Sequence, residues 1–182
     1  MRTAKSSSAF SGAAGIYTAV LVVCHVNGTL DVASGHGVPV FSLGIRCDDD
    51  EITAIDTLEP CPAVVPTRPL AKEAVRQMLA YFKDPGFKFG LPLRPAGTHF
   101  QRRVWDRIAA IPVGETRSYG DIASAIHSGP RAVGNACGAN PYLLIVPCHR
   151  VIAAHQALGG FGRGKGDFLL EVKKRLLQHE RR

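Results

Sequence analysis

The sequence predicts an α+β protein with a small sheet in its first half and a mostly helical second half. Apolar runs rich in β-branched residues flank a turn signal, Asn27-Gly28, early in the chain. Apolar residues at helical spacing dominate from Thr98 onward. Between these regions, residues 84–97 contain three prolines and three glycines, a composition typical of a linker. We therefore expect a first domain over 13–83 and a second over 98–182.

The sheet is predicted from three runs in the first half. Residues 1–12 are rich in Ser and Ala, so we expect them to be frayed. Residues 16–26 and 29–33 form a hairpin, because Asn and Gly tolerate the positive φ of a two-residue turn. Residues 38–46 supply a third strand.

An acidic loop and a helix follow the third strand. Residues 48–51 read Asp-Asp-Asp-Glu, which favours a solvated surface over a metal site. Several prolines then keep the chain extended up to Pro69. Leu70, Ala74 and Met78 recur at helical spacing, so the pattern predicts a helix over 70–82 with one apolar face.

The second half begins with a helix that has a strong start signal. Thr98 and Gln101 have the spacing of a capping box, in which each side chain binds the other's backbone N–H. Trp105 in this helix is more typical of a core residue than of a stacking platform for bases. The segment 112–114, Pro-Val-Gly, ends the helix.

Two short helices follow and predict a helix-turn-helix. Ser118 can cap a helix that runs from Tyr119 to about His127. Ser-Gly-Pro at 128–130 breaks the chain, and a second short helix extends from Arg131 to about Ala139.

The second of these helices consists mostly of residues with small side chains. Ala132 and Gly134 belong to a run of small residues, and each glycine costs helix stability. Small residues allow close packing against another element or close approach to a nucleic-acid groove. Arg131 at the helix start is unfavourable for the helix dipole. It is either a solvated arginine or one that reaches into DNA.

The charge of the chain is concentrated in its second half. The chain has 182 residues, 46% of them hydrophobic and 20% charged, and a net charge of +7. Residues 1–97 contain nine basic and nine acidic residues, whereas residues 98–182 contain thirteen and six. Such a localised basic surface favours a polyanionic partner, of which nucleic acid is the commonest.

Cysteine usage and hydropathy indicate a cytoplasmic protein, or a nuclear one in a eukaryote. The five cysteines are odd in number and show no metal-ligand spacing. An apolar run from Ala13 to Cys24 resembles a signal peptide, but it leads into the hairpin and lacks a small-residue cleavage site. No membrane association is expected.

The sequence Val146-Pro147-Cys148-His149-Arg150 carries the strongest chemical signal. A cysteine becomes a good nucleophile near neutral pH when a basic neighbour favours the thiolate. Neighbours on an extended strand point to opposite faces, so His149 reaches Cys148 only through a bend or a bridging water. Pro147 is compatible with a bend. For an isolated Cys-His pair, a buried structural cysteine is the more common alternative.

The second half resembles the O6-alkylguanine-DNA alkyltransferases, also called methylated-DNA–protein-cysteine methyltransferases. The resemblance covers roughly residues 98–182, and residues 1–97 match only in outline. It is carried by Phe100-Gln101, Val104-Trp105, Ile111-Pro112, Gly114-Glu115-Thr116, Ser118-Tyr119-Gly120, Arg131-Ala132-Val133-Gly134, Asn140-Pro141 and Val146–Ile152, in the same order and spacing.

The resemblance implies a role for each residue of a catalytic set. Cys148 would accept the alkyl group from guanine O6, and Pro147 would support it rigidly. His149 would act as a base through a water. Glu180 would orient His149 and favour its charged form. Asn140 would tie the helix-turn-helix to the active-site segment. The logic is that of a catalytic triad with a thiol nucleophile.

The resemblance also implies a DNA-binding surface and a substrate pocket. Tyr119 would crowd the target phosphate and donate to the guanine, and Arg131 would fill the gap left by a flipped nucleotide. Ala132 and Gly134 would lie against the DNA. The implied pocket residues are Pro147, Val151, Phe161 and Gly162.

The partner implied is double-stranded DNA that contains O6-alkylguanine, bound through its minor groove by a monomer. The first domain would be a small α/β unit with a ribonuclease-H-like sheet. No cofactor is implied, and we expect no metal, although some relatives carry a structural zinc. The loop over 159–164 matches the family in outline, but residues 165–169 make it longer than in the human form, which leaves the range of alkyl groups open.

Two other functions are compatible with part of the sequence. A DNA-binding regulator would explain the basic half but not the Cys-His-Glu set. A cysteine hydrolase would explain the nucleophile but not the arginine-led helix.

Overall fold

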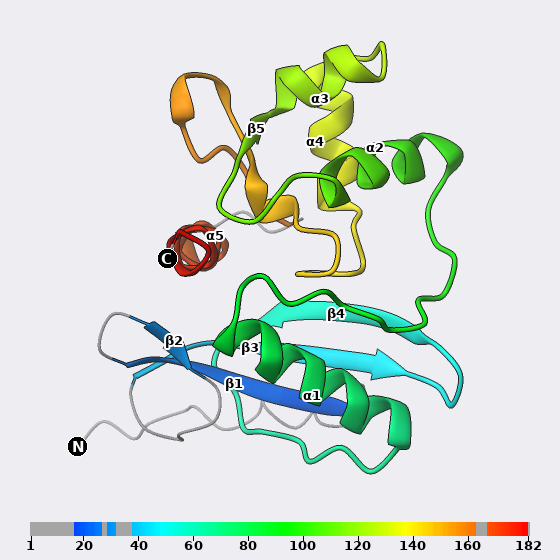
Figure 1. Cartoon of the computed structure of the whole chain (residues 1–182), viewed down its shortest axis with the longest axis vertical. Helices are drawn as coiled ribbons and strands as arrows, with labels where there is room; N and C mark the ends of the chain where they lie inside the picture. Colours follow the sequence, from blue (N-terminus) through cyan, green and yellow to red (C-terminus); the bar gives the residue numbers. More distant parts are fainter. Residues whose placement is uncertain (1–16, 27–28, 32–37, 163–166, 182) are drawn as a thin grey trace, which may run out of the picture.

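The first half of the chain forms a four-stranded antiparallel sheet (Figure 1). The computed structural model describes residues 17–26, 29–31, 38–162 and 167–181, so the expected frayed segment 1–12 and the turn Asn27-Gly28 lie outside it. The strands follow the order β2-β1-β3-β4, and their bounds are β1 Ala19–Val26, β2 Thr29–Asp31, β3 Val38–Cys47 and β4 Ile52–Leu58. Val26 pairs with Thr29, which confirms the predicted hairpin pairing.

Strand β4 was not predicted, because Asp56 and Thr57 interrupt its apolar pattern. Its partner strand compensates for this polarity. Arg46 on β3 donates to the Asp56 carboxylate at 2.8 Å across the two strands. A cross-strand ion pair of this kind contributes modestly to sheet stability, and the strand also buries Ile52, Ala54 and Ile55.

Helix α1, Pro69–Lys83, lies over one face of the sheet (Figure 1). Proline at its first position is pre-set for helical φ. Its buried face includes Ala74, Met78 and Phe82, as predicted, and Phe82 packs on Phe41 of β3 with ring centroids 6.5 Å apart. The same face also buries Tyr81, which the prediction did not include.

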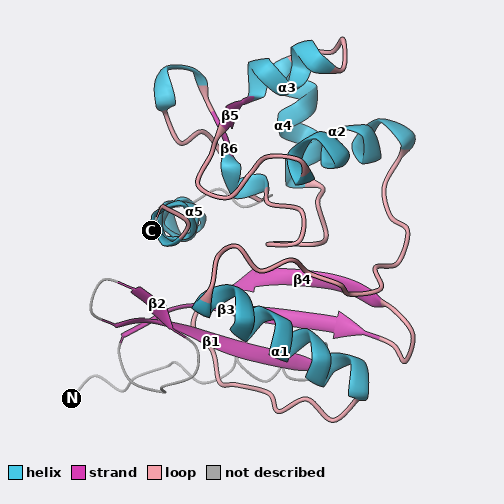
Figure 2. Cartoon of the chain, viewed as in Figure 1, coloured by secondary structure: helices cyan, strands magenta, loops and turns pink. Residues whose placement is uncertain are grey.

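The second half is mostly helical (Figure 2), so the α+β class is confirmed. Its elements are α2 His99–Ala109, β5 Arg117–Ser118, α3 Tyr119–Ala125, α4 Pro130–Gly138, η1 Cys148–Arg150, β6 Val151–Ile152, η2 Ala154–Gln156 and α5 Asp167–His179. The pattern around 167–179 had not led to a prediction of α5. Among the described helices, none has the length and apolar character that spanning a membrane requires.

Capping boxes start α2 and α3. The predicted pair Thr98 and Gln101 is confirmed, and Ser118 forms a second box with Asp121. Helix α3 ends at Ala125, before the predicted His127, because His127 adopts a positive φ of 53°. The turn between α3 and α4 allows these two helices to pack against each other.

Trp105 is a core residue, as expected. Its side chain is buried, and its indole Nε1–H donates to the carbonyl oxygen of Ala136 at 2.9 Å. That carbonyl lies in the last turn of α4, where it also accepts from Ala139 N–H at 3.2 Å. Trp105 therefore fixes α2 to the end of α4.

The outer edge of β4 binds two later segments of the chain, one from the expected linker and one from the second half. Ile52 N–H donates to Pro92 O at 2.8 Å, and Arg94 N–H donates to Ile52 O at 3.0 Å. Further along β4, Ile55 N–H donates to Pro141 O at 2.8 Å. The expected linker over 84–97 is therefore partly bound along the strand rather than free, and the chain leading to the Cys-His segment is anchored beside it.

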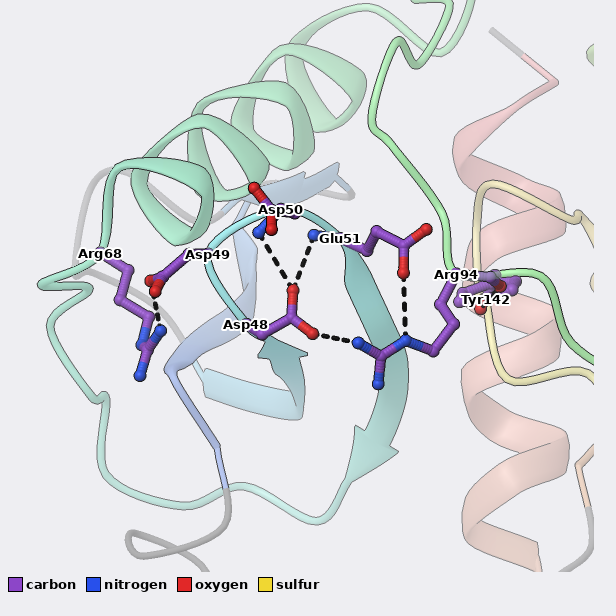
Figure 3. A network of polar contacts seen from close by, with 7 residues as sticks. All are labelled: Asp48, Asp49, Asp50, Glu51, Arg68, Arg94 and Tyr142. Carbon is purple, nitrogen blue, oxygen red and sulfur yellow. Dashed lines mark hydrogen bonds and ion pairs between the residues drawn. The ribbon is translucent and has the colours of Figure 1, made fainter.

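The acidic loop over 48–51 is largely exposed, as expected from sequence, and three of its carboxylates also form ion pairs. Figure 3 shows Arg94 between Asp48 and Glu51, with its Nε 3.1 Å from the Glu51 carboxylate. Asp49 pairs with Arg68 in the same loop region, and the Tyr142 hydroxyl donates to the Arg94 carbonyl oxygen. Such exposed ion pairs contribute little energy individually, but together they hold the loop and Arg94 in one place.

We expect Trp105→Phe to destabilise the protein by about 1–3 kcal/mol, because the smaller ring fills less of the buried space and cannot donate to the Ala136 carbonyl oxygen. Urea unfolding followed by circular dichroism measures the change. Arg107→Ala on the exposed side of the same helix is the control, with an expected change within about 0.5 kcal/mol. Equal stability of Trp105→Phe and the unmodified protein would contradict a structural role for this bond.

Candidate active site

The Cys-His-Arg segment is a tight 3-10 turn, η1, and not an extended strand. Pro147 precedes it, and Arg150 N–H donates back to Pro147 O at 2.9 Å to close the turn. Strand β6 follows directly and pairs in parallel with β5, so both ends of the turn are held. The bend that Pro147 suggested is present. It directs the Cys148 side chain toward Asn140, and those of His149 and Arg150 toward Glu180.

Asn140 connects the end of α4 to this turn. Its Nδ2 donates to Val146 O at 2.9 Å and to the Cys148 sulfur at 3.3 Å. Its Oδ1 accepts from Tyr142 N–H at 2.9 Å. One amide thus holds the backbone before Cys148 and the sulfur itself.

The Cys148 thiol is buried and shares its surroundings with a second thiol. A hydrogen bond with Cys137 raises the pKa of Cys148 well above its usual range, and burial raises it further. The same bond lowers the pKa of Cys137, aided by the charge of Lys173. The hydrogen bond between the two buried thiols therefore favours the protonated form of Cys148.

His149 and Arg150 turn away from the thiol and meet the carboxylate of Glu180. His149 Nε2 lies 2.9 Å from Glu180 Oε1, while Arg150 donates to both carboxylate oxygens at 2.8 Å. Burial alone would raise the pKa of Glu180, but these hydrogen bonds hold it well below its usual range. An ionised Glu180 accepts only, so His149 carries its proton on Nε2.

The other ring nitrogen of His149 is left available. Nδ1 is buried and has no hydrogen-bond partner among the described residues. Burial lowers the pKa of His149 despite the opposing effect of Glu180, so the ring is neutral near pH 7. A neutral, unpartnered ring nitrogen next in sequence to a thiol is suited to accept a proton.

Two cavities meet at Cys148. One, of about 480 Å³, is bounded by Tyr119, Arg131, Gly134 and the loop residues Phe161 and Gly162. The other, of about 430 Å³, extends toward β4. Both lie within the size range of ligand pockets, so the thiol faces space that a flat base and its substituent can occupy.

The ring of Tyr119 separates α4 from the loop over 159–162. A side chain at Gly159, which has φ of +66°, would approach the Tyr119 ring to 2.9 Å, so glycine is required there. The Tyr119 hydroxyl donates to Gly160 O at 3.1 Å, and burial raises its pKa. Arg131 is exposed at the rim.

Comparison with known proteins matches residues 99–182 to a family model described as "6-O-methylguanine DNA methyltransferase, DNA binding domain". A methylated-DNA–protein-cysteine methyltransferase of Mycolicibacterium paratuberculosis is 49% identical over 111 residues, which are 60% of this chain and 64% of that relative. One from Methanosarcina acetivorans is 46% identical over 111 residues, which are 60% of this chain and 68% of the relative.

A crystal structure of Mycobacterium tuberculosis OGT in complex with DNA is similar at a TM-score of 0.65 and 39% identity, covering 78% of this chain and 88% of that one. The chain belongs to the methylated-DNA–protein-cysteine methyltransferase family. Its match to the mycobacterial relative named first nevertheless spans less than two thirds of that relative's length.

Within this methyltransferase framework, the structure brings together most of the residues singled out from sequence. Cys148, Asn140, Tyr119, Phe161 and Gly162 surround the two cavities. Glu180 reaches His149 from just beyond the last residue of α5. The long-range pairing of these residues depends on α5, which had not been predicted.

Two residues expected in the pocket lie elsewhere. Pro147 lines a separate cavity of about 390 Å³ and neither of those at Cys148. Val151 is fully buried, and its carbonyl oxygen accepts from Lys173 Nζ at 2.6 Å. Both residues flank η1 in sequence without lining either cavity at Cys148. Ala132 is half-buried on α4 beside Arg131.

The sequence reasoning missed Lys173, a buried cation. Its Nζ donates to the carbonyl oxygens of Val151, Leu158 and Gly160, so it holds the loop against β6. Burial lowers its pKa to about 8. A lysine on an otherwise apolar helix face was the signal available in the sequence.

The described residues contain no cluster of three or more His, Cys, Asp or Glu side chains that could hold a metal ion. The expectations of no metal and no cofactor remain predictions.

We expect Cys137→Ala to lower the pKa of Cys148, because the hydrogen bond that retains its proton is lost. Reaction of Cys148 with iodoacetamide at neutral pH should then accelerate by roughly threefold or more. Peptide mass spectrometry over time measures this rate for Cys148 alone. Cys61→Ala, which is outside the site, serves as the control and should leave the rate unchanged. An unchanged or slower rate in Cys137→Ala would refute the coupling.

Proposed function

We propose that this protein repairs DNA by transferring the alkyl group of O6-alkylguanine to Cys148, once per molecule. The observation that carries the proposal is the position of the Cys148 sulfur. It is held by Asn140 at 3.3 Å and lies where the two cavities meet. The names of the similar proteins, including one crystallised with DNA, support the same activity.

The proposed reaction is a displacement at carbon. His149 removes the Cys148 proton through a water, and the sulfur attacks the alkyl carbon while the bond from that carbon to guanine O6 breaks. Guanine leaves with the bonding electrons, and a hydrogen bond from Tyr119 stabilises it. Glu180 orients His149 and stabilises its charged form. The product is a thioether on Cys148, which no group among the described residues around the site is suited to cleave, so turnover stops after one transfer.

The proposed DNA contact uses α3 and α4 as a helix-turn-helix. The alkyl group lies inside the base stack, so the nucleotide must be flipped at a cost of a few kcal/mol. Arg131 at the cavity rim would enter the duplex from the minor groove and fill the gap. The small side chains of α4, including Ala132 and Gly134, would permit close approach. A monomer suffices, because one chain contains every residue in the scheme.

The finer domain picture belongs to the same proposal. We assign residues 13–83 to a ribonuclease-H-like domain, 84–97 to a connector and 98–182 to the DNA-binding and acceptor domain. Free cysteines at 47, 61, 137 and 148 suit a reducing compartment that contains DNA, the cytoplasm or the nucleus.

We expect incubation with duplex DNA that contains O6-methylguanine to add one methyl group, a net gain of CH₂, to the peptide carrying Cys148. The yield should be stoichiometric, because the thioether is stable. Intact-mass and peptide mass spectrometry measure this transfer, and Cys148→Ala is the control that should gain nothing. An unchanged mass with excess DNA would overturn the proposal, and repeated turnover would indicate a hydrolase.

We also expect Arg131→Ala to slow repair of duplex DNA at least about tenfold, while reaction with free O6-methylguanine stays unchanged, because only the duplex requires nucleotide flipping. Single-turnover rates for the two substrates provide the measurement. Lys72→Ala, an exposed cation on α1, controls for loss of one positive charge. Equal slowing with both substrates would assign Arg131 a different role.

A further inference from the structure

Tyr81, a buried residue of the sheet domain over 13–83, makes direct contact with the candidate catalytic carboxylate of Glu180. The Tyr81 hydroxyl, on α1, donates to Glu180 Oε1 at 2.8 Å across 99 positions of sequence. Helix α1 lies on the sheet, whereas Glu180 follows α5 in the other half of the molecule (Figure 1). This hydrogen bond is therefore a physical link from the first half of the chain to the site.

Aromatic contacts fix the orientation of the Tyr81 ring, and with it the position of the hydroxyl. Phe82 meets it edge-on with centroids 5.3 Å apart, and Phe89 and His179 pack on it at 5.7 and 5.4 Å. The residue is 1% exposed. Burial and the adjacent charge of Glu180 raise the pKa of Tyr81 well above its usual range, so the hydroxyl remains a proton donor.

Glu180 Oε1 is shared among three donors. It accepts from His149 Nε2 at 2.9 Å, from Arg150 Nη2 at 2.8 Å and from Tyr81 at 2.8 Å. Glu180 Oε2 accepts from Arg150 Nε alone among the hydrogen bonds of the described residues. Tyr81 and His149 thus compete for the same oxygen, and the strength of one bond affects the other.

The Tyr81 hydroxyl is not needed to neutralise the carboxylate. The bidentate Arg150 pair already supplies a full positive charge to Glu180. A neutral donor on the oxygen that faces His149 instead fixes where that oxygen lies and reduces the negative charge that it presents to the imidazole.

We propose that Tyr81 is a positioning residue for alkyl transfer, which acts through Glu180 Oε1 on His149. This inference rests on the proposed function, in which His149 is the base for Cys148. The charged and titratable groups around His149 are Glu180, Arg150 and Lys173, with Cys148 next to it in η1. Of the residues that act on this set, Tyr81 alone comes from the sheet domain among the hydrogen bonds described here.

The test is Tyr81→Phe, which removes one oxygen atom and keeps the packed ring. Without this donor, Glu180 Oε1 presents more negative charge to His149 and stabilises its protonated form. We expect the rate of Cys148 methylation at neutral pH to fall roughly three- to tenfold. We also expect the acid limb of its pH profile to move upward by roughly half a unit. A merely structural loss would lower the rate without moving the limb.

Tyr17→Phe is the matched control, because the Tyr17 hydroxyl also binds a carboxylate, that of Asp56, which lines the cavity toward β4 but makes no hydrogen bond to Glu180 or His149 among the described residues. Its pH profile should coincide with that of the unmodified protein. Site-specific replacement of Tyr81 by 3-fluorotyrosine supplies a stronger donor, and it should move the acid limb downward. An unmoved limb in Tyr81→Phe, or shifts of the same sign in both Tyr81 variants, would overturn the inference.

A readout without DNA separates this inference from the proposed function. NMR titration of the His149 imidazole in the free protein should give a higher pKa in Tyr81→Phe than in the unmodified protein. If the unmodified protein fails to methylate Cys148, the proposed function fails while this titration still tests the coupling. An identical His149 titration in the two proteins would refute the coupling itself.

Discussion

The buried carboxylate of Glu180 is the interaction on which the candidate site depends. It is 4% exposed and accepts hydrogen bonds from α1 and from two residues of η1. Arg150 extends the link, because its Nη1 donates to Ile111 O at 2.6 Å just after α2. Removing one partner from such a buried ion pair costs about 3–5 kcal/mol, so each element that Glu180 joins is held by the others.

The outer edge of the sheet provides a second constraint, on the chain that leads to η1. Strand β4 would present unpaired backbone groups at its outer side, which proteins usually cover. Here Pro92, Arg94 and Pro141 cover it through backbone hydrogen bonds. Because Pro141 follows Asn140 directly, the hydrogen bond that covers the edge also places Asn140. The sheet half of the molecule contributes to the site both through this edge and through Tyr81.

Local features of the fold were predictable from sequence, and long-range ones were not. The capping box at Thr98, the hairpin pairing at Val26 and the core position of Trp105 depend on neighbours in sequence or on residue type. Strand β4 escaped prediction because Arg46 offsets its polar residues from another strand. Tyr81 escaped because a tyrosine on an apolar helix face gives no sign of a carboxylate so distant in sequence.

The same distinction applies to the thiol. The Cys148-His149 pattern alone suggested a thiolate favoured by its neighbour, whereas the family resemblance paired His149 with Glu180. The structure shows the contact of His149 with Glu180, and the Cys148 thiol forms a hydrogen bond with Cys137. A thiol with a raised pKa carries little thiolate at neutral pH and reacts slowly with stray electrophiles. An acceptor that is used once, as proposed for Cys148, would gain from such protection. In the proposed reaction, activation must then come with the substrate, because filling the cavity brings the alkyl carbon against the Cys148 sulfur in an enclosed space.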